Sequence, residues 1–313
     1  MSEKMIVIRQ TELGEPDVLH QAEVDRPEPG ATELLVRVRA AAVNPVDWKI
    51  RRDGHWLTPP FVLGWDVSGV VEQVGVGVSL FAPGDEVYGF PWFPHQAGGY
   101  GEFVTAPSRH FAHKPAGLSH IEAAGIPLAG LTAWQGLVDV ANVQAGQRVL
   151  VTAAAGGVGH LAVQIAKARG AHVIGTARAD KHDFLRELGV DEPIDYTAVD
   201  VAASLRDVDV ILEAIGGEQT LALIQTLKPG GIVIPLPANT IPDSLGAQAK
   251  RHGVRWTPLL VEPDHHGLRE LAALVERGAL RVHVEQTFPL ADAAKAHELG
   301  ERGRVTGKLV LTV

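Results

Sequence analysis

The chain has 313 residues, of which 46% are hydrophobic and 21% are charged, with a formal net charge of −9 and a pI near 5.9. This length favours about two domains, and the composition is that of an ordinary globular protein. The acidic balance argues against nucleic acid as a partner, because a nucleic-acid-binding face is basic. The sequence contains no cysteine, which excludes disulfides and thiolate metal sites.

The N-terminus holds only a short apolar run at residues 6–8, which is too short for the core of a signal peptide. No stretch reaches the uninterrupted apolar length of a membrane span. We therefore expect a soluble, cytoplasmic protein with no membrane partner.

The first part of the chain is rich in short strands and turns. Strands are predicted, from β-branched content or alternation, at residues 5–9, 34–43, 67–74, 86–88 and 101–105. Their spacing is typical of a compact, partly closed β-domain. Helical character begins near Ser119, which forms a capping-box pattern with Glu122, and a longer helix is predicted over 127–141.

From residue 147 onwards the pattern alternates between strand and helix. Later strands are predicted at 208–213, 232–235, 254–260, 282–288 and 308–313, and later helices at 220–227, 265–277 and 291–300. Alternation of this kind predicts an α/β fold with a doubly wound parallel sheet.

The most specific pattern lies at residues 148–181. A β-branched run at 149–152 enters a glycine-rich turn at 153–159, and a helix at about 157–168 and a strand at 172–176 follow. This βαβ pattern is typical of a dinucleotide site, where small residues let the backbone and the helix N–H groups approach a pyrophosphate.

On the G-x-G-x-x-G pattern the slots fall on Ala154, Gly156 and Gly159, so alanine replaces the first glycine. A tight strand-to-helix turn with no ligand is the alternative interpretation.

The end of the second strand indicates which nicotinamide cofactor is bound. NAD selectivity usually rests on an acidic residue there, but Ala177 occupies the tip, and Arg178 and Lys181 follow. An arginine fork matches a 2′-phosphate, so we predict NADPH. Asp180 is an acidic residue close to this position. It either caps the following helix, which we favour, or reaches the ribose. The alternative to a 2′-phosphate site is that Arg178 and Lys181 are solvated surface charges.

Several segments, in this order and spacing, resemble the zinc-independent medium-chain dehydrogenase/reductases, in their quinone oxidoreductase or enone reductase branch. They are N-P-V-D at 44–47, L-G-W-D-V-S-G-V-V at 63–71, P-G-D-E-V at 83–87 and G-K-L-V at 307–310. The resemblance implies a GroES-like β-domain built from residues 1–119 and 261–313, and a Rossmann NADP-binding domain at 120–260. It also implies a homodimer.

Zinc is not expected, because the residue types of a zinc site are replaced. Zinc alcohol dehydrogenases of the superfamily use a Cys, a His-Glu pair and a further Cys or acid. Asn44 stands in the first Cys position here, and Trp65-Asp66 replaces the pair. A conjugated acceptor needs no strong Lewis acid, because hydrogen bonds stabilise the developing negative oxygen. We therefore expect a small-molecule quinone or enone as substrate.

The resemblance also implies roles for individual residues. Asn44 orients the nicotinamide or the substrate oxygen, Lys49 donates to an enolate oxygen or a phosphate, Trp65 forms a flat wall, and Asp66 holds a local network. Alternatively, Asn44 is only a turn residue, Lys49 is a surface lysine and Trp65 belongs to the core. No obligate general acid stands out, which leaves water as the proton source.

Beside Asn44, the residues expected to bind the cofactor are Thr132, Ala155, Gly156, Gly157, Val158, Gly159, Thr176, Arg178, Lys181, Tyr196, Ala214, Ile215, Gly216, Leu236, Pro237 and Lys308.

The function predicted first is an NADPH-dependent, zinc-independent oxidoreductase that reduces quinones or activated C=C bonds of enones by hydride transfer. Two alternatives remain open: an NADPH-binding sensor or structural protein without turnover, and an enoyl-thioester reductase.

Overall fold

The computed structural model describes residues 3–236 and 240–313, which form two compact units. The first unit comprises Met1–Leu131, Glu262–Arg277 and Val282–Val313, and the second comprises Thr132–Val261 and Gly278–Arg281. The domain boundaries predicted at 119/120 and 260/261 stay predictions. Within the described ranges, no helix combines the length and apolar character needed to cross a membrane.

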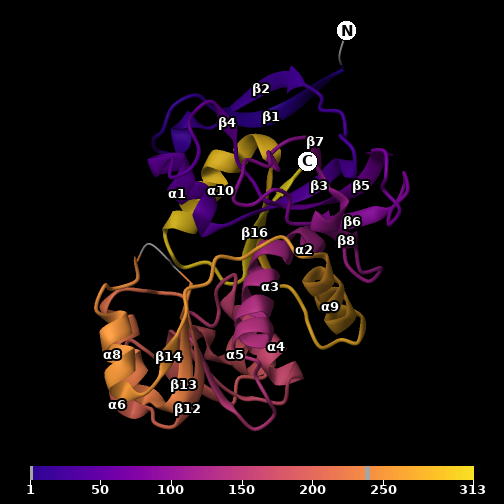
Figure 1. Cartoon of the computed structure of the whole chain (residues 1–313). Helices are drawn as coiled ribbons and strands as arrows, with labels where there is room; N and C mark the ends of the chain where they lie inside the picture. The colour runs from indigo at the N-terminus through magenta and orange to yellow at the C-terminus, as the bar shows by residue number, and fades with distance from the viewer. Residues whose placement is uncertain (1–2, 237–239) are drawn as a thin grey trace. The chain divides into compact units, whose positions relative to one another are not determined.

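A seven-stranded sheet forms the centre of the first unit, with the order β15-β16-β3-β5-β6-β8 and β7 paired to β3. Its strands are β3 (Glu33–Val43), β5 (Asp66–Val74), β6 (Glu86–Gly89), β7 (Phe103–Pro107), β8 (Phe111–His113), β15 (Val284–Pro289) and β16 (Lys308–Thr312). The C-terminal β16 pairs antiparallel with β3, with Leu309 opposite Val43, as Figure 1 shows in yellow beside indigo. This register brings Lys308 next to Asn44.

A smaller three-stranded sheet has the order β2-β1-β4, with β1 (Lys4–Gln10), β2 (His20–Asp25) and β4 (Phe61–Val62). The helices of the first unit are α1 (Pro45–Asp53), α2 (His120–Ala124), α9 (His265–Glu276) and α10 (Ala293–Glu301). The capping box of Ser119 and Glu122 is confirmed at the start of α2. Helix α1 was not predicted, although Asn44 caps it and Pro45 opens it, a position that proline favours.

The second unit contains a six-stranded parallel sheet with the order β11-β10-β9-β12-β13-β14. Its strands are β9 (Arg148–Val151), β10 (His172–Ala177), β11 (Glu192–Asp195), β12 (Val208–Glu213), β13 (Leu227–Pro235) and β14 (Arg255–Trp256). Counted along the chain, this order is third, second, first, fourth, fifth, sixth, which is the doubly wound dinucleotide-binding arrangement.

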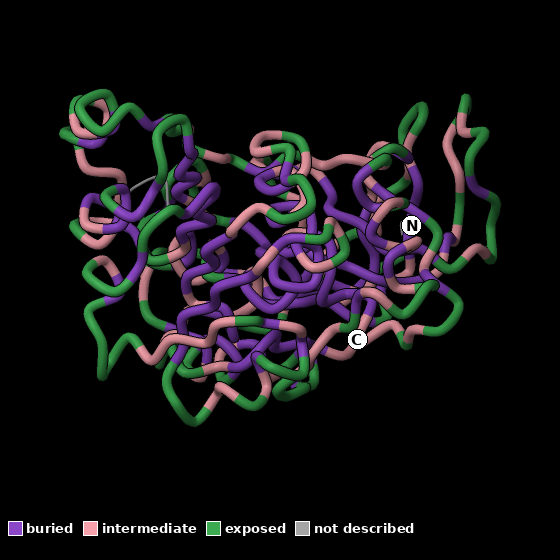
Figure 2. Tube along the Cα trace, turned by 90° about the horizontal axis from the view of Figure 1, so that it is seen from below, coloured by how far each residue is buried: buried purple, intermediate pink, exposed green. Residues whose placement is uncertain are grey.

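Helices cover both faces of this sheet. The chain enters the unit through α3 (Pro127–Trp134), and the crossover helices are α4 (Gly159–Ala168), α5 (His182–Glu187), α6 (Val201–Ser204), α7 (Glu218–Leu223) and α8 (Leu245–His252). Apolar side chains of α6, α7 and α8 share one core cluster with Leu150, Ile211 and Val233, while α4 packs against β9 and β10 (Figure 1). Strand β12 is buried along its whole length, and Figure 2 colours the buried residues of the trace purple.

Three predicted elements differ from the structure. The helix predicted at 127–141 changes to a π-helix over Gln135–Val140, where Gly136 packs closely against Leu212. The strand predicted at 254–260 is only the short β14, because Pro258 has no N–H with which to continue the ladder. The helix predicted at 220–227 is α7 up to Leu223 and a 3-10 turn over Ile224–Thr226, and β13 begins at Leu227.

Candidate functional site

The glycine-rich turn 153–159 joins β9 to α4 at the carboxyl end of the strand. Helical hydrogen bonding begins where the His160 N–H donates to the Gly156 carbonyl oxygen at 3.0 Å, so the N–H groups just before it lack an intrahelical carbonyl. A Cβ on Gly159 would lie 2.3 Å from the Ala153 carbonyl oxygen, so only glycine fits there. The turn therefore presents bare backbone, which fits the pyrophosphate of a dinucleotide.

The carboxyl ends of the parallel strands meet at one edge of the sheet, and the predicted cofactor residues follow those ends. They are Ala155, Gly156, Gly157, Val158 and Gly159 after β9, Thr176, Arg178 and Lys181 at the end of β10, Tyr196 after β11, Ala214, Ile215 and Gly216 after β12, and Leu236 after β13. The strand order reverses between β9 and β12, and a doubly wound sheet binds its ligand at that reversal. The predicted Pro237 lies outside the described residues.

Glu213, which the sequence did not single out, organises the turn after β12. Its side chain has no exposed surface, and it accepts hydrogen bonds from the backbone N–H groups of Ile215 at 2.8 Å and Gly216 at 2.7 Å. It also accepts from the hydroxyls of Thr152 at 3.3 Å and Thr220 at 2.8 Å. Glu213 therefore ties the end of β9 to the turn after β12. The available signal was an acid at the end of an apolar strand, directly before a turn with two glycines.

The polar side chains at the ends of β10 and β11 face solvent. Arg178 is exposed, Lys181 is half-buried, and Tyr196 is 50% exposed. Asp180 lies inside the helical turn Ala179–Lys181, and the N-cap position of α5 belongs to Lys181 with no side-chain cap bond. The favoured capping role of Asp180 is therefore wrong. Two cations directly after β10 fit a phosphate group in this place.

Asn44, Asp66 and Lys308 form a buried polar cluster in the first unit, with exposed fractions of 2%, 0% and 3%. The Asn44 Nδ2 donates to Asp66 Oδ2 at 2.8 Å, and the Lys308 ammonium donates to the same oxygen at 3.3 Å and to Asn44 Oδ1. The other Asp66 oxygen accepts the Leu128 N–H at 2.6 Å. Burial raises the pKa of Asp66, and Lys308 and Asn44 oppose that rise. The cluster fixes which way the Asn44 carboxamide points.

The other predicted side chains of this region lie in different environments. Trp65 has no exposed surface, donates to the His95 carbonyl oxygen at 2.7 Å and meets the Phe93 ring edge-on at 5.7 Å. These contacts favour the core interpretation of Trp65. Lys49 is half-buried on α1, and Thr132 is buried in α3.

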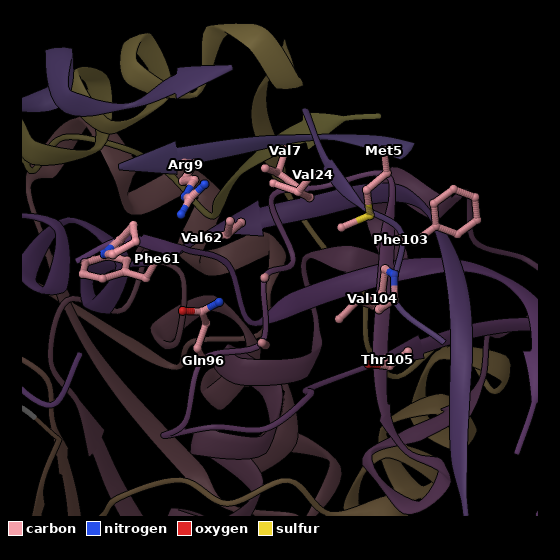
Figure 3. A pocket seen from close by; sticks show the side chains of 14 residues that line it. Met5, Val7, Arg9, Val24, Phe61, Val62, Gln96, Phe103, Val104 and Thr105 are labelled. Atoms are coloured by element: carbon pink, nitrogen blue, oxygen red, sulfur yellow. The ribbon is translucent and has the colours of Figure 1, made fainter. Parts of the chain in front are cut away.

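A separate hollow of about 330 Å³ lies among β1, β2, β4 and β7 of the first unit. Figure 3 shows Arg9 and Gln96 among mostly apolar side chains such as Val7, Phe61 and Val104. Its lining includes none of the predicted site residues.

The chain has no cysteine, and residues 3–236 and 240–313 contain no group of three or more His, Asp or Glu side chains placed to hold a metal ion. The sheet order and the glycine-rich turn at its reversal point define a dinucleotide-binding protein. The first, β-rich unit holds the buried amide, carboxylate and ammonium of Asn44, Asp66 and Lys308.

Comparison with known proteins agrees with this class. Residues 30–116 match the family model described as alcohol dehydrogenase GroES-like domain, and residues 188–311 match the one described as zinc-binding dehydrogenase. The mitochondrial NAD(P)H oxidoreductase RTN4IP1 of Mus musculus is 36% identical over an alignment that covers 90% of this chain and 82% of the mouse protein.

Two solved structures are similar over nearly the whole chain. The quinone oxidoreductase from Coxiella burnetii has a TM-score of 0.93 at 36% identity and covers 99% of this chain and 100% of its own. The mycobacterial protein Rv1454c, solved in complex with NADPH, has a TM-score of 0.89 at 31% identity with coverages of 99% and 100%.

The chain belongs to the medium-chain dehydrogenase/reductase family, in its quinone oxidoreductase branch. It is an NAD(P)H oxidoreductase. The predicted family and the predicted fold class, a GroES-like β-domain with a Rossmann parallel sheet, are confirmed.

Proposed function

We propose that the protein is an NADPH-dependent reductase of quinones or of the activated C=C bonds of enones. The observation that carries this proposal is the cluster of Asn44, Asp66 and Lys308. Zinc-dependent members of the superfamily place metal-binding side chains at the first two of these positions, whereas here an amide and a carboxylate are bonded to a lysine ammonium.

The chemistry of the acceptor follows from this cluster. NADPH, when bound, supplies the hydride. Negative charge then develops on an oxygen conjugated with the reduced carbon, and a positioned hydrogen-bond donor stabilises it. The Asn44 carboxamide has a second N–H besides the one given to Asp66, and Lys308 holds its oxygen. Asn44 therefore serves as the oriented donor, and water supplies the proton.

The second unit carries the residues that bind the cofactor in this proposal. The backbone of the glycine-rich turn at 153–159 holds the pyrophosphate, and Glu213 fixes the turn that carries Ala214 and Ile215. Ala177 at the end of β10 leaves no acid to select NAD, and Arg178 and Lys181 follow it. These residues favour the 2′-phosphate of NADPH.

NADPH oxidation by the purified protein tests the proposal, with benzoquinone, cyclohexenone and a crotonyl thioester offered in turn. We expect turnover of the quinone or the enone. Turnover of the thioester alone would favour the enoyl-thioester reductase. Tight NADPH binding without turnover of any acceptor would favour the sensor or structural protein.

We further propose that the protein is a cytoplasmic homodimer. Strand β14 forms one edge of the parallel sheet, and Trp256 and Leu260 beside that edge are 37% and 57% exposed. An unpaired sheet edge with apolar side chains needs a cover, and a second copy supplies one. Light scattering at micromolar concentration tests this, and a monomer would contradict it.

A further inference from the structure

Behind the Asn44 cluster lies a second group of buried polar side chains, which the proposed reaction leaves unused. Asp47, Arg51, Tyr100 and His297 all lack exposed surface. Residues far apart in sequence meet here, because α10 brings His297 to Arg51 of α1 across 246 positions. Gly64 makes room for the Tyr100 ring: it has a φ of 95°, and a Cβ there would lie 2.4 Å from Tyr100 Cδ1.

The hydrogen bonds of this group run in one direction. The Arg51 guanidinium lies 3.1 Å from His297 Nδ1, and a guanidinium only donates, so Nδ1 must accept. The proton of the neutral ring is therefore on Nε2, which donates to the Tyr100 hydroxyl oxygen at 3.1 Å. Burial and the Arg51 charge lower the pKa of His297 to about 3, which keeps the ring neutral. The Tyr100 hydroxyl can therefore turn its own proton towards Asp47, and burial and the negative charge of Asp47 raise the pKa of that hydroxyl.

Asp47 also accepts hydrogen bonds from two backbone groups. One carboxyl oxygen accepts the Asn44 N–H at 2.7 Å, and the other accepts the Gly64 N–H at 3.2 Å. Asp47 thus ties the turn that carries Asn44 to the segment that leads into Asp66. A carboxylate only accepts, whereas a protonated carboxyl would turn a hydroxyl proton towards another donor. The ionised form alone satisfies all three donors.

We propose that Asp47 is the positioning residue of Asn44, and that the directed chain Arg51–His297–Tyr100 makes its ionised carboxylate the form that holds Asn44 beside Asp66. The inference deepens the proposed function and rests on it, since Asn44 is there the group that acts on the acceptor.

The charges around Asp47 come from four elements. Burial raises the pKa of Asp47 to about 7; the Asn44 N–H lowers it, Asp66 of β5 raises it and Lys308 of β16 lowers it. Arg51 of α1 is neutralised by Glu301 of α10, with Nη2 and Oε1 3.0 Å apart. Asp47 should therefore titrate within the pH range in which enzyme kinetics can be measured.

The pH profile of kcat/KM for NADPH and benzoquinone, from about pH 5.5 to about pH 9, tests the proposal with the full chain. The wild type should lose activity below about pH 7, as Asp47 takes up a proton. Tyr100→Phe removes a donor to the carboxylate, so the midpoint should rise by about one to two pH units while the high-pH plateau is kept. His297→Leu should shift it likewise, and His297→Gln, which offers both an acceptor and a donor, should restore it.

Tyr88→Phe is the matched control. Tyr88 also lacks exposed surface, but its hydroxyl donates to the Leu268 carbonyl oxygen and not to Asp47. This variant should leave the midpoint unmoved. A wild-type profile that stays flat, or a Tyr100→Phe variant with a lower plateau and an unmoved midpoint, would overturn the proposal.

Thermal unfolding gives a readout that needs no substrate. Because burial raises the pKa of Asp47 from 3.8 to about 7, its protonated form stabilises the fold at low pH, and that contribution is lost as the pH rises through about 7. Tyr100→Phe raises this pKa further, so its Tm deficit should be larger at about pH 9 than at about pH 5. A deficit that is equal at both pH values would overturn the proposal. If no acceptor is reduced, the proposed function fails, and this measurement still decides the role of Asp47.

Discussion

The two candidate regions hold their polar groups in opposite ways. In the first unit, Asn44, Asp66 and Lys308 are at most 3% exposed and bond to one another. In the second unit the binding element is bare backbone, and Arg178 and Tyr196 face solvent. A buried, mutually bonded cluster is set before any ligand arrives, whereas an exposed arginine such as Arg178 loses side-chain freedom when a phosphate binds it. Changes in the first region should therefore affect stability and chemistry, and changes in the second should affect binding.

The largest effect is expected where the buried cluster loses its cation. Lys308→Met leaves the Asp66 carboxylate buried without its charge partner, and should lower the free energy of unfolding by about 3–5 kcal/mol. Urea denaturation measures this. Lys4→Met is the control, because the pair of Lys4 and Asp25 is exposed and its loss should change little. Equal effects of the two substitutions would remove the distinction between the regions.

Asn44→Ala should act on chemistry more than on cofactor binding. Loss of one oriented donor to a developing oxyanion lowers kcat/KM by about 10²–10³-fold. The dissociation constant for NADPH should change much less, because an oriented donor helps most as charge grows on the acceptor. Steady-state kinetics with benzoquinone and cyclohexenone, together with NADPH titration, check this. An unchanged kcat/KM would show that Asn44 is only a helix cap.

Arg178→Ala should act on cofactor binding alone. A charge-assisted hydrogen bond contributes about 1.5–3 kcal/mol, so NADPH should bind roughly 10- to 150-fold more weakly, and NADH should bind nearly as before. Arg186→Ala is a matched control, since Arg186 lies nearby on α5, is exposed and pairs only locally with Asp183. Fluorescence titration measures both constants. Equal losses for NADPH and NADH would contradict a phosphate contact.

The smallest effect is expected from metal removal. Treatment with a chelator should leave the turnover of NADPH with a quinone unchanged, because the chain has no thiolate ligands and Asn44 and Asp66 are bonded to Lys308. Elemental analysis of the purified protein complements the assay. Stoichiometric zinc, with activity lost on chelation, would show that the first region works as a metal site.

Short sequence patterns correctly predicted those strands and turns that depend on neighbouring residues alone. The strand at 208–213 is β12, and the glycine-rich turn lies at the carboxyl end of β9 as expected. Helix α1 was missed because asparagine before proline signals a turn as readily as it caps a helix. Lys308 was assigned to the cofactor; that assignment stays a prediction, while its ammonium bonds Asn44 and Asp66.

The roles of Asp47 and Glu213 were not readable from sequence, because they depend on the fold. The role of Asp47 depends on Tyr100 and His297, which lie near it only because of tertiary packing. Glu213 likewise bonds Thr152, which the parallel pairing of β9 and β12 places beside it. Spacing within a motif carries no information about such partners.

The comparison of kcat/KM for NADPH and NADH, with benzoquinone as the acceptor, tests the central claim most directly. We predict turnover with both, and a preference for NADPH of about 10- to 150-fold, the value of one charge-assisted contact to the 2′-phosphate. Equal values for the two cofactors, or no reduction of the quinone with either, would contradict the account.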